Sequence, residues 1–322
     1  MERGIFKEQR LFIKEKHKDG QIMAPDINLT FLGTSAQIPT AKRNHSAMLL
    51  VYGGENILVD CGEGTQRQFR KARMNPCKVN RILITHRHGD HVFGLPGLIS
   101  TFDLSGYNKT LYIYGPKGIK RFLENFLGLN YVKRDFEIKI EEISGKFFET
   151  DDFYLEAEEM EHGIPTNAYS FVKKGQRRID RGKLKKSKLP SGPILKKLKE
   201  GKDIVHEGKK YLAKNLTYTE GDKKVSFVLD TKMNNKIVSF VKGSDLLVCE
   251  SSFDDSLKET AKEHLHLTVK QAGEIAKKSK SKKLVLTHIS QRYEKDLKGL
   301  LAEAKKVFKN SSIAEDFDSV SI

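Results

Sequence analysis

The chain has 322 residues, 38% of them hydrophobic and 31% charged, which is typical of a globular protein and excludes one that is disordered throughout. Its apolar runs are far shorter than the roughly 18 residues that a membrane span needs, so we expect no membrane partner. Subtracting 42 acidic from 58 basic residues leaves a net charge of +16, which favours a polyanionic partner such as nucleic acid. The three cysteines, Cys61, Cys77 and Cys249, form no close pair, which excludes a disulfide scaffold and favours a cytoplasmic location.

The first predicted strand begins at residue 27, so residues 1–27 form the segment that leads into it. Residues 1–26 include six basic and five acidic side chains, unlike a secretory or transit peptide. We therefore predict an N-terminal extension of unknown role, with an apolar patch at residues 11–13, followed by one main domain over residues 28–322.

Strands and helices alternate along the main domain, and such alternation predicts an α/β fold in which helices cover sheets. Short segments rich in Val, Ile and Leu predict strands at 27–32, 47–51, 57–59, 81–84, 111–114, 153–158, 168–172, 224–229, 246–248 and 284–286. Apolar residues at helical spacing predict helices at 65–72, 95–102, 119–126, 268–279 and 294–307.

A basic segment interrupts the domain at residues 173–210. It contains 15 basic and four acidic residues, and its net charge of +11 leaves only +5 for the rest of the chain. Because it has five glycines and no aromatic residue, we predict an arm that forms little core of its own. A short helix is expected between Pro193 and Gly201, with lysines on its outer face. A solvated run of surface charge is the alternative interpretation.

Three histidines and one aspartate follow a predicted strand within six positions. His86 and His88 are two residues apart and can direct their side chains into one site, while Gly89 permits a turn that directs Asp90 and His91 into a second site. Imidazole and carboxylate groups are zinc ligands, and fewer than four protein ligands leave a position for water. Such a cluster is far more specific than a single histidine, which is more often a structural residue.

The cluster resembles the signature of the metallo-β-lactamase superfamily, and the segments around it resemble the ribonuclease Z family, whose members mature tRNA 3′ ends. The resemblance runs from about residue 29 to residue 317. It is carried by HRHGDH at 86–91, FGLPGL at 93–98, FLGTSA at 31–36 followed by Pro39 and Arg43-Asn44, DCGEGTQ at 60–66, YGPKG at 114–118, and LTHIS at 286–290 followed by Arg292-Tyr293.

This resemblance implies a four-layer αβ/βα metallo-β-lactamase sandwich with two zinc ions at one edge of the paired sheets. A histidine before a glycine is commonly a turn residue, but the position of His162, 71 residues after His91, supports a role as ligand. The implied ligands are His86, His88 and His162 for the first zinc and Asp90, His91 and His288 for the second, with Asp230 bridging the two.

The resemblance also implies an auxiliary acid–base pair, Glu250 and His266. His264 is an alternative to His266, but the spacing to the following helix favours His266. The chain departs from the family pattern in four places. Leu229 replaces a glycine before the bridging aspartate, and Ala41 stands where the lysine of the opening loop is expected, with Lys42 one position later. CESS at 249–252 stands where the family often has HEAT, and HLT at 266–268 stands where it has HST.

The implied activity is hydrolysis of precursor tRNA. Two adjacent zinc ions activate a water near neutral pH and bind the scissile phosphate. Asp90 is then the expected proton acceptor, and His266, oriented by Glu250, would neutralise the departing 3′ oxygen. We expect a 3′-OH on the tRNA and a 5′-phosphate on the trailer. For His266 the structural alternative is a capping role before the helix at 268–279.

The basic arm resembles the exosite of the same family, which contains a Gly-Pro motif. Folded tRNA is recognised mainly through its shape and phosphates, so an arm held away from the catalytic pocket could bind it. The family implies a homodimer in which one subunit's arm presents tRNA to the other's active site. The residues expected to contact RNA are Arg177, Arg178, Lys185, Lys186, Gly192, Pro193, Lys196, Lys197 and Lys199.

Two other classes of function compete with this one. Superfamily phosphodiesterases and other hydrolases use the same metal cluster on small molecules, but the basic insertion and the Gly-Leu-Pro-Gly segment oppose that interpretation. The β-CASP nucleases need a large extra domain, for which the chain has no room. A non-catalytic RNA-binding protein with a vestigial metal site is opposed by the complete set of predicted ligands.

Overall fold

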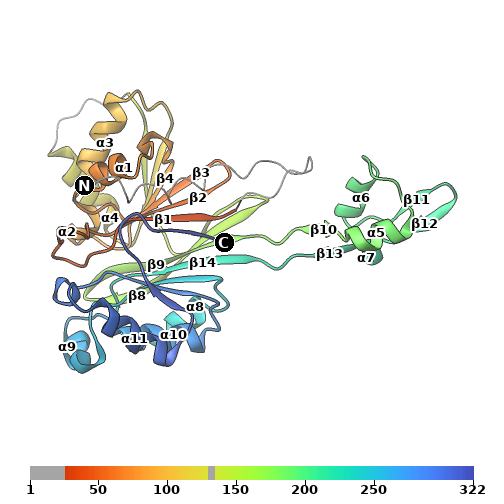
Figure 1. The fold of residues 1–322 in the computed structure, drawn as a ribbon. Coiled ribbons are helices and arrows are strands. Elements are labelled where there is room, and N and C mark those ends of the chain that lie inside the picture. The colour runs from red at the N-terminus through yellow and green to blue at the C-terminus, as the bar shows by residue number, and fades with distance from the viewer. Residues whose placement is uncertain (1–25, 130–134) are drawn as a thin grey trace, which may run out of the picture.

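The computed structural model describes residues 26–129 and 135–322. The apolar patch at residues 11–13 therefore lies outside the described residues. Two seven-stranded sheets face each other, and helices cover the outer side of each (Figure 1). In the described part of the chain, no helix combines the length and apolar character needed to cross a membrane.

The first sheet joins an antiparallel half to a parallel half. From β1 to β3 neighbouring strands are antiparallel, and from β3 to β6 they are parallel. In spatial order its strands are β18 (Ser319–Ser321), β1 (Asn28–Gly33), β2 (Ala47–Tyr52), β3 (Glu55–Val59), β4 (Arg81–Leu83), β5 (Leu111–Gly115) and β6 (Ile138–Glu142).

The second sheet has the same mixed character. Strands β14 to β17 are parallel, whereas β7, β8, β9 and β14 pair antiparallel. Its order is β17 (Ser311–Ile313), β16 (Leu284–Thr287), β15 (Leu246–Glu250), β14 (Lys223–Val228), β9 (Ile164–Lys173), β8 (Phe153–His162) and β7 (Gly145–Glu149).

Three apolar clusters fill the three interfaces of the four layers. One lies between the sheets and includes Phe31 and Phe227, one lies under the helices of the first sheet, and one lies under those of the second. Each fully buried side chain of this size contributes about 1.5–3 kcal/mol. The covering helices are α1 (Thr65–Lys71), α2 (Gly89–Val92), α3 (Leu95–Leu104) and α4 (Ile119–Gly128) on one side, and α8 (Asn235–Phe240), α9 (Lys258–Glu263), α10 (Val269–Lys278) and α11 (Leu297–Val307) on the other.

Local sequence signals determine where these elements begin and end. Helix α10, for example, is capped by Thr268, whose hydroxyl accepts from the Gln271 amide while the Gln271 side chain accepts from the Thr268 amide. Every strand and helix predicted for the main domain is present, with ends shifted by a few residues. The predicted four-layer sandwich is therefore confirmed.

The carboxyl ends of the parallel strands gather polar residues at one edge of the sheets. Asp60 follows β3, Asp230 follows β14 and His288 follows β16, and each adopts a positive φ, of 58°, 40° and 57°. A left-handed backbone is uncommon for residues other than glycine, and it turns the chain sharply at the end of the strand. The edge that the strands share thereby receives side chains from both sheets.

The basic segment projects from the body between β9 and β14 (Figure 1). Its two connecting strands, β10 (Arg177–Ile179) and β13 (Thr217–Thr219), pair antiparallel, so the excursion returns at about residue 219 rather than at the predicted residue 210. The distal unit contains α5 (Arg181–Ser187), α6 (Leu195–Lys199), β11 (Ile204–His206), β12 (Lys209–Tyr211) and α7 (Ala213–Leu216).

The distal unit has a small core of its own. Leu198 is fully buried, and Leu189, Ile204 and Leu216 pack around it. The composition of the segment predicts little core, because glycines and lysines dominate it, but its few leucines and isoleucines are spaced so that they meet. The expected helix after Pro193 is α6.

Candidate metal centre

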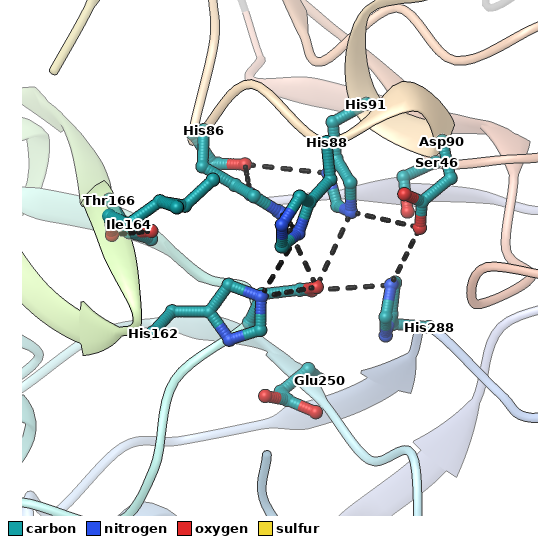
Figure 2. A network of polar contacts seen from close by, with 12 residues as sticks. Ser46, His86, His88, Asp90, His91, His162, Ile164, Thr166, Glu250 and His288 are labelled. Carbon is teal, nitrogen blue, oxygen red and sulfur yellow. Dashed lines mark hydrogen bonds and ion pairs between the residues drawn. The ribbon is translucent and has the colours of Figure 1, made fainter. Parts of the chain in front are cut away.

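The seven predicted ligand side chains converge at the shared edge of the sheets (Figure 2). They form two groups, and Asp230 belongs to both. In each group the ligand atoms lie within 4.8 Å of one another. The first group is His86, His88, His162 and Asp230, and the second is Asp90, His91, Asp230 and His288. The sequence therefore predicted which residues meet; that they bind metal remains a prediction.

Each side chain is delivered by the end of a regular element. His86 follows β4, and α2 carries Asp90 and His91 in its single short turn. His162 is the last residue of β8 and pairs with Ile164 across a tight hairpin in which Gly163 has φ 67°. A positive φ at this turn is readily accepted by glycine, so the hairpin fixes where His162 stands.

Gly89 has a different role from the one predicted. It is the first residue of α2 and is not among the glycines with positive φ. A Cβ at this position would collide with the ring of Phe93. The glycine thus leaves room for that ring to lie against the backbone.

The two oxygens of Asp230 face different histidines. Oδ1 lies 3.2 Å from Nε2 of His288, whereas Oδ2 lies 3.5 Å from Nε2 of His86 and 3.6 Å from Nε2 of His162. The Asp90 carboxylate, 3.4 Å from Nε2 of His288, completes the far side of the second group. One carboxylate therefore connects the two groups, as its predicted bridging position requires.

The electrostatics of the site favour an added positive charge. Burial opposes ionisation of Asp230, yet the surrounding histidines, His288 and His91 foremost, hold the pKa of its carboxyl well below the usual range. Burial also lowers the pKa of His91, but the carboxylates of Asp90, Asp230 and Asp60 outweigh it and raise that pKa well above the usual value. At His86, burial and then the charge of His91 lower the pKa, which keeps the imidazole neutral.

Two buried atoms of the second group test whether a metal fits. His91 Nε2 and Asp230 Oδ1 are buried, and each has an ionisable neighbour, Asp90 Oδ2 at 3.3 Å and His288 Nε2 at 3.2 Å respectively. Neither atom makes a hydrogen bond among residues 26–129 and 135–322. Buried polar atoms in native proteins are nearly always paired, so these two need a partner that the side chains do not provide. Imidazole nitrogen and carboxylate oxygen suit a divalent cation of borderline hardness, so a metal fits the site.

Hydrogen bonds behind the histidines fix which ring nitrogen faces the centre. Asp60 is fully buried; its Oδ2 lies 2.7 Å from Nδ1 of His91 and its Oδ1 accepts from the Thr85 amide at 2.7 Å. With Nδ1 donating to Asp60, Nε2 of His91 is left to face the centre. Nδ1 of His162 lies 3.0 Å from the carbonyl of Leu265 and acts in the same way.

Ser252 provides the corresponding contact for His288. The Ser252 hydroxyl donates to Glu250 Oε2 at 2.8 Å and lies 2.9 Å from Nδ1 of His288. Because its single proton goes to Glu250, the hydroxyl oxygen accepts from His288. Neither Asp60 nor Ser252 was predicted to support a ligand; the signal available in the sequence was a carboxylate and a hydroxyl placed at or just after strand ends.

Glu250 and His266 form the predicted pair. Nδ1 of His266 lies 3.0 Å from Oε2 of the fully buried Glu250, which also accepts from the Thr231 amide at 2.8 Å. Burial lowers the pKa of His266, but the carboxylates of Glu250 and Asp230 outweigh it and raise that pKa to about 9. His266 is therefore protonated at neutral pH.

The alternatives at this position are resolved by geometry. The ring of His264 lies against Phe253, with 6.4 Å between the ring centroids, so it is His266 that contacts Glu250. The cap of α10 is Thr268, which contradicts the capping role considered for His266. Leu229 and Cys249, two of the departures from the family pattern, are fully buried core residues.

The predicted RNA-binding residues lie on the arm and not at the metal centre (Figure 1). Arg178 pairs with Glu220 at 3.1 Å, and Arg177 donates to the Thr217 hydroxyl at 3.0 Å. Lys185 and Lys186 lie in the last turn of α5, Gly192 and Pro193 precede α6, and Lys196, Lys197 and Lys199 are exposed on α6.

Comparison with known proteins assigns the chain to a family. A ribonuclease Z of Listeria welshimeri is 39% identical over 302 residues, covering 90% of this chain and 97% of that protein. A ribonuclease Z of Archaeoglobus fulgidus is 38% identical over 300 residues, covering 91% and 97%. The chain belongs to the ribonuclease Z family.

Solved structures support the same assignment. The short form of human tRNase Z matches with a TM-score of 0.68 at 29% identity, covering 92% of this chain and 99% of that one. The metallo-β-lactamase fold protein YhfI from Bacillus subtilis matches with a TM-score of 0.67 at 20% identity, covering 92% and 100%, which supports the fold alone. The family model of the anti-Pycsar protein Apyc1 matches residues 27–171.

Membership of the ribonuclease Z family confirms the predicted enzyme class, a nuclease among the hydrolases. The metallo-β-lactamase fold of such an enzyme, together with the two groups of His and Asp donors, implies a divalent metal.

The contact between Asp60 and His91 yields a testable prediction. Asparagine tolerates the left-handed backbone of Asp60, so Asp60→Asn removes the charge and largely keeps the shape. We expect the affinity for divalent metal to fall about 10–100-fold, because asparagine has one acceptor oxygen and cannot accept from both the Thr85 amide and Nδ1 of His91. A chelator-competition titration measures this, with the exposed Asp151→Asn as control. Equal affinities in the two variants would contradict the role assigned to Asp60.

Proposed function

We propose that the protein is a zinc-dependent endoribonuclease that removes the 3′ trailer from precursor tRNA, leaving a 3′-OH on the tRNA and a 5′-phosphate on the trailer. The observation that carries this proposal is the convergence of six donor side chains on a seventh, Asp230, beside the Glu250–His266 pair. The relatives are named ribonuclease Z and tRNase Z, which supports tRNA as the substrate. The imidazole and carboxylate donors favour zinc, and their division into two groups favours two ions per chain.

The predicted ligands have different roles at the metal centre. When bound, two zinc ions supply Lewis-acid stabilisation of the phosphate and activation of the attacking water. Asp90 lies at the edge of the second group and accepts the proton of that water. The first ion would be held by His86, His88 and His162, the second by Asp90, His91 and His288, and Asp230 would be shared between them.

His266 is placed to act on the leaving oxygen. Its ring centroid lies 5.0 Å from that of His162 and 5.5 Å from that of His288, so it spans the two groups. Glu250 holds Nδ1, which leaves Nε2 free to donate a proton to the departing 3′ oxygen. The side chain is 18% exposed, and a substrate at the mouth of the site can therefore reach it.

The arm binds the body of the tRNA in this proposal. Exposed lysines on α5 and α6 surround the small distal core and form a basic surface that suits phosphates. We propose that the main domain, residues 28–322, is the nuclease domain and that the arm serves the partner subunit of a homodimer. The enzyme would then act in the cytoplasm, where precursor tRNA is available.

The first prediction concerns the metal. The protein should cleave a 3′-extended precursor tRNA once at the trailer junction, and His86→Ala or Asp230→Ala should abolish cleavage while the protein stays folded. Excess chelator should have the same effect on the wild type, and about two zinc ions per chain should be found by elemental analysis. His206→Ala, on the arm, is the control and should keep its zinc. Full activity after stoichiometric metal loss would refute the proposal, and cleavage confined to small phosphodiesters would favour a small-molecule phosphodiesterase.

The second prediction concerns His266. His266→Ala should lower kcat about 10²–10⁴-fold, because the departing oxygen loses its proton donor. Zinc content should be unchanged, since the two groups of donors remain. His264→Ala, two residues away, should cleave at nearly the wild-type rate. A His264 variant that lost as much activity as the His266 variant would show that the wrong histidine had been chosen.

The third prediction separates RNA binding from chemistry. The Glu220 amide donates to the Gln176 carbonyl at 3.0 Å, so an Asn-Gly turn can replace residues 177–219. Processing of precursor tRNA should fall severely, while hydrolysis of bis(p-nitrophenyl) phosphate should be preserved, because the arm supplies none of the metal-centre residues. The dependence of tRNA affinity on salt should also flatten.

A variant that keeps the arm but loses three charges is the matched control. Lys196→Gln, Lys197→Gln and Lys199→Gln change exposed side chains and leave Leu198 and the distal core intact. The salt slope should become shallower here as well. An unchanged slope and affinity after excision would show that the arm is a solvated surface segment, and loss of small-substrate hydrolysis would show that it is structural.

A further inference from the structure

Phe93 is exposed although it directly follows the metal-ligand motif. Its side chain is 56% exposed, while the two preceding residues, His91 and Val92, are fully buried. A large apolar side chain in contact with water loses the free energy that its burial would provide. A ligand that covered the Phe93 ring would recover part of that free energy.

The Phe93 ring lies against the backbone between two predicted metal ligands. Gly89 separates His88 from Asp90, and a Cβ at Gly89 would overlap ring carbons of Phe93. His88, next to Gly89, is itself exposed, so the first group of donors opens to solvent beside the segment against which the ring lies. The ring therefore stands close to where a scissile phosphate would enter.

Phe93 is also the first of three aromatic rings in a row. Its centroid lies 5.8 Å from that of Phe126, and Phe126 lies 5.5 Å from Phe122 in a stacked arrangement. Both partners belong to α4, which stands beside α2 on the same side of the molecule (Figure 1). Phe126 supports one side of the Phe93 ring, and much of the remaining surface stays open.

We propose that Phe93 forms a stacking subsite for a nucleobase next to the scissile phosphate. The inference rests on the proposed function and adds how the single-stranded 3′ end is held. Unstacked bases of single-stranded RNA bind to exposed aromatic rings, and this stacking is tolerant of sequence because every base has a π-face. Glycine at position 89 brings the ring near the ligands, and the row of phenylalanines holds it in place.

Replacing the ring distinguishes stacking from simple packing. Phe93→Leu keeps an apolar side chain of similar size but removes the π-face, whereas Phe93→Tyr keeps both. For a 3′-extended precursor tRNA we expect kcat/KM to fall about ten-fold in Phe93→Leu and to stay near the wild-type value in Phe93→Tyr. Zinc content and thermal stability should be unchanged in both. Equal activity of the leucine variant would overturn the proposal, and equal losses in both variants would also overturn it.

Abasic substrates identify the base. Precursor tRNAs with an abasic nucleotide on one or the other side of the cleavage site should lose activity with the wild type. On one of these two substrates, the Phe93→Leu variant should be almost as active as the wild type, because the base that would stack on Phe93 is already absent. Independent, multiplicative losses on both substrates would overturn a direct contact. If the wild type failed to cleave any precursor tRNA, the proposed function would fail first, so the two failures are distinguishable.

The composition of the chain provides a direct optical test. The chain contains no tryptophan, so Phe93→Trp introduces a single indole at the subsite. Binding of a short single-stranded RNA should quench its fluorescence through stacking. Leu104→Trp, at the 88% exposed end of α3, is the control and should not respond. Equal responses from both indoles would refute a specific subsite.

Discussion

The structure depends on one nearly fully buried carboxylate, Asp230, which is surrounded by histidines from both sheets. Removing an ionised group from water costs several kcal/mol, and that cost has to be offset by opposite charge or by metal. The surrounding histidines supply that opposite charge and hold the pKa of the Asp230 carboxyl well below its usual range. Asp230 Oδ1 and His91 Nε2 still lack hydrogen-bond partners in the described residues, and a divalent cation between the two groups of donors would provide one for each.

Three residues of the site or beside it adopt backbone conformations that are unfavourable by themselves. Asp60, Asp230 and His288 each have a positive φ at the end of a strand, at a cost on the order of 1 kcal/mol or more each. The cost is sustained because each strand is anchored in a sheet whose inner face is packed: Leu229, immediately before Asp230, is fully buried between the sheets. The geometry of the metal centre therefore depends on the packing of the core between the sheets.

The cluster at residues 86–91 could be predicted from the sequence because metal chemistry limits which side chains can bind, and three histidines with an aspartate in six positions rarely serve structure alone. His162, Asp230 and His288 are far from the cluster in sequence, and only the resemblance to the ribonuclease Z family implied them. Asp60 and Ser252 could not be predicted as supporting residues, because their role depends on which ring nitrogen they meet in space. For the arm, the sequence predicted the segment but not where it ends. Its basic charge indicated the segment, whereas its return through β13 depends on pairing with β10, which no local pattern specifies.

The same strands connect the arm to the metal centre and set the distance between them. β9 begins one residue after the His162–Gly163 turn and ends where the arm departs, while β14 begins at the arm and ends two residues before Asp230. Ten residues of β9 at about 3.3 Å each separate the two by about 30 Å. A small phosphodiester cannot reach from the metal centre to the arm of the same chain. A ligand that touched both would have to be tens of ångströms long, which a folded tRNA is and a small metabolite is not.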